Sequence, residues 1–296
     1  MSCRSACDNR QGVHRWDVLG LDQKSLARLT ATQLRALIRK GAYDRHTAGL
    51  AQGKLQCNLA ILPEAFAEDF IQFCRNNPKP CPIVGIGTAG DPMMPDLGED
   101  IDIRTDVPRY RIFEDGKLCN EVTDIRGHWR DDLVTVALGC SFTFENALMS
   151  QGIPVKHIAL DQTVPMYRSN IALVPAGPFG GEMVVTMRPI TKNRINEAWE
   201  ISGRYPQAHG APIGQGDPSA IGIADLDKPD WGDPVEIAED EVPVYWACGV
   251  TPQNVLMKAR VPFCITHAPG HMLIADIAED ADIPVFHVTN QTLNLR

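Results

Sequence analysis

Residues 244–257 read VYWACGVTPQNVLM, and this stretch contains the unit on which the fold is built. Its apolar start predicts a buried strand from Val244 to Ala247, which ends at Cys248. A helix is expected next, with Thr251 as its N-cap. Pro252 suits the first helical position because its φ is fixed and it has no N–H group to satisfy. A strand, a tight turn and a helix start are typical of α/β proteins.

A second stretch repeats this pattern 108 positions earlier (248 − 140). Residues 133–149 read LVTVALGCSFTFENALM, in which an apolar strand again ends at a cysteine, Cys140, and Thr143 stands at the expected helix start. Six of the fifteen positions in 140–154 are identical to their partners in 248–262, where ordinary composition gives about one. The repeat predicts two similarly built corners.

The two corners are candidate ligand sites. The end of a strand beside a helix N-terminus is where α/β sheets bind ligands, and the helix dipole favours an anion there. The same field lowers the pKa of a neighbouring thiol. We therefore expect Cys140 and Cys248 to line a site for a small anion. The alternative for either cysteine alone is packing, because cysteine is among the most buried residue types.

Apolar runs and helix periodicity alternate through the rest of the chain, which predicts an α/β fold with helices packed on mixed sheets. A turn at Glu114-Asp115-Gly116-Lys117 predicts a hairpin, and Thr32 is the expected cap of a helix that Gly41 ends. Further strands are expected at 83–86, 171–174, 183–187, 263–266 and 286–289.

Several side chains outside the corners are candidate site residues. His267 and His271 are four positions apart, but Pro269 and Gly270 between them exclude the regular helix that a metal site of this spacing needs. We expect the first, and less firmly the second, to reach the crevice beside Cys248. Structural hydrogen bonding is the alternative for both histidines.

Two arginines and one loop complete the set of candidates. Arg188 and Arg168 follow or end apolar stretches and could each hold a carboxylate through two hydrogen bonds, although a salt bridge is the alternative for each. His209 lies in a loop rich in glycine and proline. Asp100, Asp102 and Asp106 form an acidic cluster that either solvates a turn or binds a cation.

Composition excludes several classes of function. The chain has 296 residues, a net charge of −9 and a pI near 5.4, so it lacks the basic face that nucleic acid requires. Nine cysteines, without a Cys-x-x-Cys pair, predict reduced thiols and no disulfide framework. With no signal-like or membrane-spanning run, we expect a cytoplasmic protein with no membrane partner. We expect neither a metal nor another cofactor.

Many of these segments resemble the D-glutamate cyclase-like hydro-lyase family. The matching motifs run in one order through most of the chain, between about 35 and 276. They are Arg39-Lys40-Gly41, Thr47-Ala48-Gly49-Leu50, Asn77-Pro78-Lys79-Pro80-Cys81-Pro82, Gly139–Glu145, Val164–Arg168, Met187-Arg188-Pro189, His209–Pro212, Trp246–Gln253 and Thr266–Met272.

The resemblance implies two different α/β subdomains. We place a main domain at 24–164 together with 241–296, a smaller inserted α+β domain at 165–240, and a loose N-terminal arm at 1–23. It also implies elimination of water from a small carboxylic or amino acid, with D-glutamate closing to 5-oxo-D-proline as the most specific version.

That reaction assigns roles to the candidates. His267 or His271 would be the base, and Glu145 the acid if burial raises its pKa. A helix N-terminus behind Cys140 or Cys248 would stabilise the oxyanion. Substrate binding is assigned to Arg188, Arg168, Thr143, Thr251 and His209.

Two other functions remain open at the sequence level. The paired cysteines could act on opposite faces of a substrate carbon, as in a cofactor-independent racemase or isomerase, which requires both sulfurs to face one cavity. The chain could instead be a non-catalytic module that binds a small carboxylate. A homodimer is a further expectation.

Overall fold

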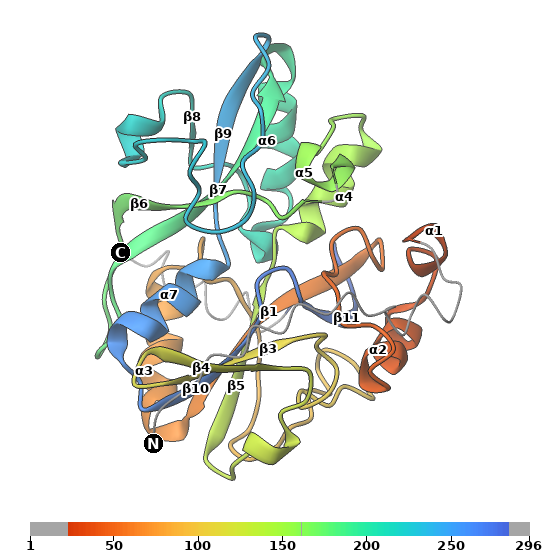
Figure 1. Cartoon of the computed structure of the whole chain (residues 1–296), viewed down its shortest axis with the longest axis vertical. Helices are drawn as coiled ribbons and strands as arrows, with labels where there is room; N and C mark the ends of the chain where they lie inside the picture. Colours follow the sequence, from red (N-terminus) through yellow and green to blue (C-terminus); the bar gives the residue numbers. More distant parts are fainter. Residues whose placement is uncertain (1–22, 161, 284–296) are drawn as a thin grey trace, which may run out of the picture.

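The structure is a computed structural model that describes residues 23–160 and 162–283. It consists of two β-sheets, with the seven-stranded sheet in the lower half and the four-stranded sheet in the upper half of Figure 1. The larger sheet has the order β2-β5-β1-β10-β3-β4, with β11 also paired to β1, and the smaller has the order β6-β7-β9-β8. The strands are β1 (Lys54–Pro63), β2 (Ile83–Ile86), β3 (Tyr110–Glu114), β4 (Lys117–Val122), β5 (Leu133–Gly139), β6 (Met166–Ala172), β7 (Glu182–Thr191), β8 (Gly214–Gln215), β9 (Glu241–Ala247), β10 (Phe263–His267) and β11 (Leu273–Ala278).

The combination of helices with two different sheets confirms the predicted α/β class, but the sheets are not mixed. Every strand pair among the described residues is antiparallel. The prediction failed on this detail because alternation of strands and helices along the chain does not fix which strands become neighbours. The predicted hairpin is confirmed, since Asp115 and Gly116 join β3 to β4 with φ of 49° and 77°, as a tight antiparallel turn requires.

Within the described residues seven α-helices accompany the sheets, and two of them pack where the sheets meet. They are α1 (Gln23–Leu26), α2 (Ala31–Arg39), α3 (Glu64–Asn76), α4 (Phe142–Ser150), α5 (Lys156–Ala159), α6 (Ile195–Gly203) and α7 (Val250–Ala259). One apolar cluster contains Phe70 of α3 and Leu256 of α7 together with Leu138 of the larger sheet and Met187 of the smaller. The two sheets therefore share a core, and Figure 1 shows α7 between the two sheets and α3 beside the larger one.

Strand β1 is the centre of the larger sheet. It is buried at nine of its ten positions and pairs with β5, β10 and β11. A strand surrounded in this way must be apolar on both faces, so a polar side chain within it, such as Asn58, calls for a specific partner.

The helix starts differ from the expected ones. Helix α2 is capped by Thr30, not Thr32, and its capping box is completed by Gln33. Helices α4 and α7 have Ser141 and Gly249 at the N-cap position, so Thr143 and Thr251 lie inside the first turn. Threonine is a favoured cap, but in both of these helices its hydroxyl contacts the main chain of a neighbouring strand instead.

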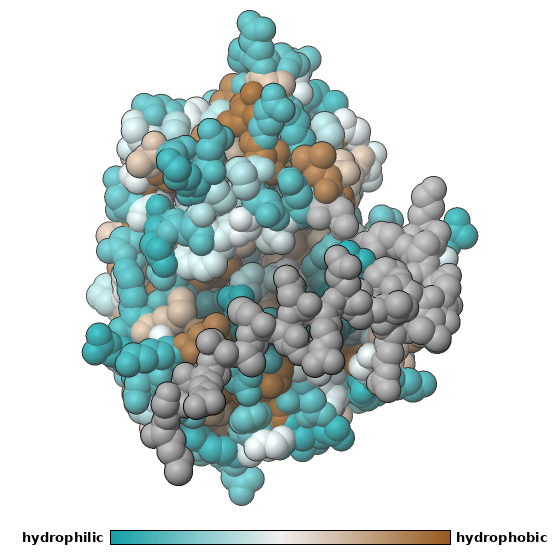
Figure 2. Space-filling view, viewed as in Figure 1, coloured by the Kyte–Doolittle hydropathy of each residue, from teal (hydrophilic) through white to brown (hydrophobic). Residues whose placement is uncertain are grey.

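The division into domains stays a prediction. Strand β9 was placed in the main domain, yet it pairs with β7 and β8 of the smaller sheet. The strand expected at 286–289 and almost all of the arm at 1–23 lie outside the described residues. Among those that are described, no helix has the length and apolarity to cross a bilayer. Hydrophilic residues dominate the visible face in Figure 2, and its apolar residues emerge in separate areas.

Candidate active site

The two predicted corners meet at one cavity. Its walls include Cys140 and the start of α4 on one side and Cys248 and the start of α7 on the other. The volume open to the centres of water molecules is about 30 Å³, which is room for about two waters. The full lining is Asn58, Cys140, Ser141, Phe142, Thr163, Val164, Met166, Thr186, Cys248, Gly249, Val250, His267, Pro269, Gly270 and Met272.

The corners share one local geometry, as the repeated sequence predicts. The sulfur of Cys248 accepts a hydrogen bond from the Val250 N–H at 3.4 Å, and the sulfur of Cys140 accepts one from the Phe142 N–H. The carbonyl of each cysteine also accepts the N–H three residues later, at 3.2 Å for Cys140 and 3.0 Å for Cys248. Each thiol therefore stands at the positive end of a helix.

Burial outweighs this local field. It raises the pKa of Cys140 to about 12 and that of Cys248 to about 12, although the N–H donors and the charge of Arg188 act to lower both values. The expectation that the helix start lowers the thiol pKa is therefore wrong for these buried thiols, because the loss of hydration destabilises the thiolate more than the helix start stabilises it. Both thiols are protonated at neutral pH.

Asn58 of β1 joins the two corners and was not predicted. Its Nδ2 donates to the carbonyl of Gly139 at 2.7 Å. A Cβ atom on Gly249 would lie 2.2 Å from the same Nδ2, so the second corner can approach this closely only with glycine. The side chain of Asn58 thus lies between the residue before Cys140 and the residue after Cys248.

His267 reaches the cavity from the end of β10, as predicted, but it is not a base with a pKa near neutrality. Burial lowers its pKa to about 3. The Leu59 N–H donates to its Nδ1 at 3.0 Å, which leaves the ring proton on Nε2. The Gln253 amide lies 3.2 Å from both ring nitrogens and donates to the His267 carbonyl. The ring is therefore a neutral hydrogen-bond donor.

Arg188 acts on the cavity through two hydroxyls. It is buried, and it donates to Thr186 Oγ1 at 2.9 Å and to Ser141 Oγ at 3.1 Å. Its Nε donates to Glu145 at 3.0 Å, and its Nη2 also contacts that carboxylate. Thr186 and Ser141 line the cavity, whereas Arg188 does not. The guanidinium therefore does not present a free fork to a carboxylate.

Glu145 is the counterion of Arg188. Burial alone would raise its pKa, but the charges of Arg188 and His157, together with their hydrogen bonds, lower it below its ordinary value. His157 Nε2 lies 3.3 Å from the same carboxylate oxygen. The condition under which Glu145 would be an acid, a raised pKa, is not met.

The two threonines of the repeat hold helices to strands. Thr251 Oγ1 donates to the carbonyl of Val184 at 3.2 Å and accepts its N–H at 3.0 Å, which fixes α7 on β7. Thr143 Oγ1 lies 3.5 Å from the N–H of Gln56 in β1. Both threonines are fully buried and neither lines the cavity.

Three other predicted residues do not line the cavity. His271 turns its Nδ1 to the Pro269 carbonyl at 2.9 Å. His209 bonds the Lys79 carbonyl at 2.9 Å, and burial lowers its pKa to about 4. Arg168 is half-exposed and pairs with Asp230 at 2.6 Å, which is the salt bridge considered as its alternative.

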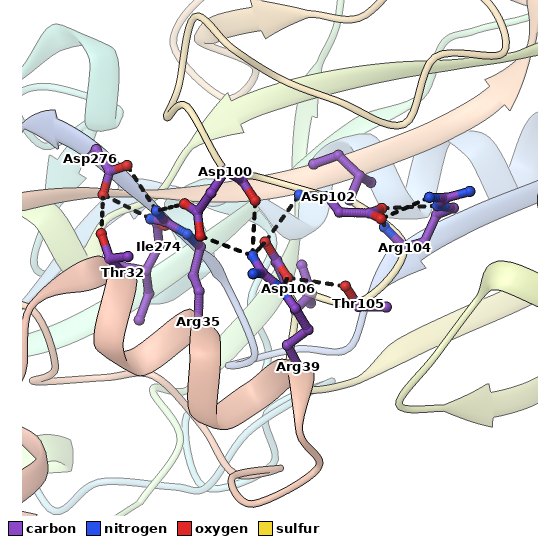
Figure 3. Close-up of polar contacts among 12 residues, drawn as sticks. Thr32, Arg35, Arg39, Asp100, Asp102, Arg104, Thr105, Asp106, Ile274 and Asp276 are labelled. Atoms are coloured by element: carbon purple, nitrogen blue, oxygen red, sulfur yellow. Dashed lines mark hydrogen bonds and ion pairs between the residues drawn. The ribbon is translucent and has the colours of Figure 1, made fainter.

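The acidic cluster is neutralised by arginines (Figure 3). Arg35 bridges Asp100 and Asp276 at 2.5 Å and 2.8 Å, and Arg39 pairs with Asp106 at 2.6 Å. These pairs join α2 to β11 and to the loop that carries the aspartates. Within the described ranges, no group of three or more His, Cys, Asp or Glu side chains is placed to hold a metal ion.

Fold and site together define an α/β protein with two antiparallel sheets and a small cavity lined by residues of both. Residues 134–276, which include both corners, match the family model described as D-glutamate cyclase. A protein of Jannaschia sp. strain CCS1 named "Putative hydro-lyase" is 68% identical over 256 residues, which are 86% of this chain and 96% of that protein. The chain belongs to the D-glutamate cyclase family, whose curated relatives bear the hydro-lyase name.

Other relatives agree. A protein of the same name from Dinoroseobacter shibae is 60% identical over a stretch that covers 88% of this chain and 86% of that protein. One from Rhodopseudomonas palustris is 57% identical over 84% and 91%. Among solved structures, a nitrogen repressor-like protein of Methanococcus jannaschii covers 79% of this chain and 91% of its own at 12% identity, but its TM-score of 0.36 supports no conclusion.

Proposed function

We propose that this protein is a hydro-lyase that eliminates water from a small carboxylic or amino acid, and that D-glutamate, closing to 5-oxo-D-proline, is a substrate. The observation that carries the proposal is the cavity itself, which combines two helix starts with hydroxyl, amide and imidazole donors. Those groups suit a carboxylate substrate and an anionic intermediate. The family and the names of its members support the same reaction class.

The substrate carboxylate is held by Ser141 and Thr186. Both hydroxyls accept hydrogen bonds from Arg188. The hydrogen of Ser141 is left to donate toward a ligand, whereas Thr186 Oγ1 donates to the Trp246 carbonyl over a long 3.5 Å, a bond that it exchanges for one to the ligand. A hydroxyl that accepts from a guanidinium is a stronger donor because the two bonds polarise one another. Arg188 does not touch the substrate in this proposal but acts through the two hydroxyls, and Glu145 keeps the guanidinium in position.

Loss of water is assisted by donors that are already in place. In the cyclisation, the amine attacks the carbon of the side-chain carboxyl, and negative charge collects on an oxygen. The two protons that the substrate's ammonium loses leave with one carboxyl oxygen as water. The Nε2–H of His267 and the N–H groups at the starts of α4 and α7 stabilise that oxygen. The Leu59 N–H orients the imidazole by donating to its Nδ1.

The small volume of the cavity supports a reaction from which water must be removed. Room for about two waters is too little for glutamate, so the walls separate when the substrate binds. Closure around the substrate then strengthens every polar contact and keeps bulk water from reversing the elimination.

The test is proton NMR of recombinant protein incubated with D-glutamate or L-glutamate. We expect signals of 5-oxoproline from the D-enantiomer. Ser141→Ala removes a proposed contact and should lower the rate by about 10-fold or more, as loss of one buried hydrogen bond to a charged group does. Arg168→Met, at a half-exposed arginine that does not line the cavity, is the control and should react as the wild type does.

Intact protein that forms no 5-oxoproline would contradict the cyclase proposal. Thermal stabilisation by D-glutamate without product would favour the binding module instead. The cytoplasmic location and the homodimer stay predictions.

A further inference from the structure

We propose that Cys140 and Cys248 are an acid–base pair that removes the proton from the α-carbon of the bound carboxylate and returns one to the opposite face. The site would then exchange and racemise the α-carbon of a small amino acid or cyclic amide. This inference rests on the proposed function for its substrate class, but not on the elimination of water.

The position of the two thiols carries the inference. Both line the same cavity, yet they come from different sheets, one following β5 and the other following β9. A ligand between the corners would therefore meet one thiol on each side. The space between them is small enough that a ligand would contact both walls at once.

The surroundings of the two thiols are similar in two respects, although the charge of Glu145 acts on Cys140 alone and raises its pKa. Each sulfur accepts the N–H of the second residue that follows it, and the charge of Arg188 favours the thiolate of each. An acid–base pair that works in both directions needs two thiols in similar surroundings, because each must be the base for one enantiomer and the acid for the other. Packing alone would not require a hydrogen bond to either sulfur.

The proton steps balance without a further reactant. One thiol first gives its proton to solvent. The resulting thiolate takes the α-proton, and the electron pair of the broken C–H bond passes into the carboxylate, whose oxygens Ser141 and Thr186 hold. The other thiol then gives its proton to the opposite face of the carbon. The product is the mirror-image acid, and the two sulfurs have exchanged protonation states.

A third cysteine provides a matched control. Cys264 on β10 is as buried as the other two, and burial raises its pKa to about 12 as well. It belongs to the core shared by the two sheets and is not one of the residues that line the cavity. Its substitution by serine tests the effect of losing a buried thiol without changing the site.

The experiment is proton NMR in D₂O with D-glutamate, L-glutamate and 5-oxo-D-proline as separate probes, followed by chiral chromatography. We expect the wild type to exchange the α-proton of at least one probe and to form its mirror image. Cys140→Ser and Cys248→Ser should each lower racemisation by at least about 100-fold, the usual scale of acid–base catalysis. Cys264→Ser should stay within about twofold of wild type.

The same spectra separate this inference from the cyclisation. Formation of 5-oxoproline with no exchange at the α-carbon of any probe overturns the thiol pair and leaves the cyclase proposal standing. Exchange at the α-carbon without 5-oxoproline supports the thiol pair and contradicts the cyclase proposal. Neither reaction in folded protein overturns both. If a serine variant does not fold, the wild-type spectra with the three probes still show whether the α-proton exchanges, and the absence of exchange overturns the inference.

Discussion

Replacement of Arg188 by methionine tests whether one buried ion pair organises the wall of the cavity. The substitution keeps most of the side-chain volume but leaves Glu145, only 1% exposed, without its principal counterion. Removal of one partner from a buried pair costs about 3–5 kcal/mol. For a protein of this size, about 2 °C per kcal/mol converts this loss to a fall in Tm of about 6–10 °C.

The matched control is Arg168→Met. That arginine makes the same type of contact, with Asp230, but its side chain is 55% exposed, and a surface pair contributes about 0–1 kcal/mol. We expect its Tm to fall by less than about 2 °C. Differential scanning fluorimetry of the two variants beside the wild type measures both shifts.

The pH dependence gives a second readout. In the wild type the pKa of Glu145 is below its ordinary value, so its contribution to stability is present above the unfolded pKa and is lost as pH falls through the folded one. Without Arg188, burial should raise that pKa, and the folded variant then binds a proton more readily than the unfolded chain. The Tm deficit of Arg188→Met should therefore shrink from pH 8 to pH 5. Equal shifts in both variants, or a deficit that grows in acid, would refute the reasoning.

Three further outcomes are expected. Gly249→Ala should destabilise the protein by about 1–3 kcal/mol in urea unfolding, because its Cβ would lie 2.2 Å from Asn58 Nδ2, whereas Gly127→Ala, with nothing within 4 Å, should not. His267 has a depressed folded pKa of about 3, so its contribution to folding stability is complete above about pH 6.5 and is lost as pH falls toward 3. His267→Asn should therefore reduce the slope of the free energy of unfolding against pH in acid by up to about 1.4 kcal/mol per pH unit. An unchanged slope would contradict this. Carbamidomethylation of Cys140, followed by mass spectrometry, should accelerate about tenfold per pH unit from pH 7 to 10, since its pKa is about 12 and the thiolate is the nucleophile; a rate that levels off near pH 8 would contradict the burial argument.

The corners of the site could be predicted from sequence because their signals are local. An apolar strand followed by a cysteine and a helix start is visible in a few residues, and its repetition marked both Cys140 and Cys248. His267 could be placed for the same reason, since it ends a short apolar strand. The threonine caps were wrong because a buried hydroxyl can satisfy a distant strand, as Thr251 does at Val184, and no local rule anticipates that partner.

What sequence did not predict depends on contacts between distant segments. Strand β1 was missed altogether, because its leucine, alanine, glutamine and asparagine residues carry little strand propensity. Asn58 was missed with it, although an asparagine inside an apolar run is a detectable signal. The antiparallel order of the sheets and the ion pair between Arg188 and Glu145 join segments that are remote in sequence, and no periodicity encodes them.

The central claim is that a small carboxylate binds between the two corners. A crystal structure of the protein with 5-oxo-D-proline, at a concentration that calorimetry shows to be saturating, tests it most directly. We predict density for the ligand between the sulfurs of Cys140 and Cys248, with its carboxylate about 3 Å from the Ser141 and Thr186 hydroxyls. A saturating ligand found elsewhere on the molecule, with this cavity unchanged, would contradict the account.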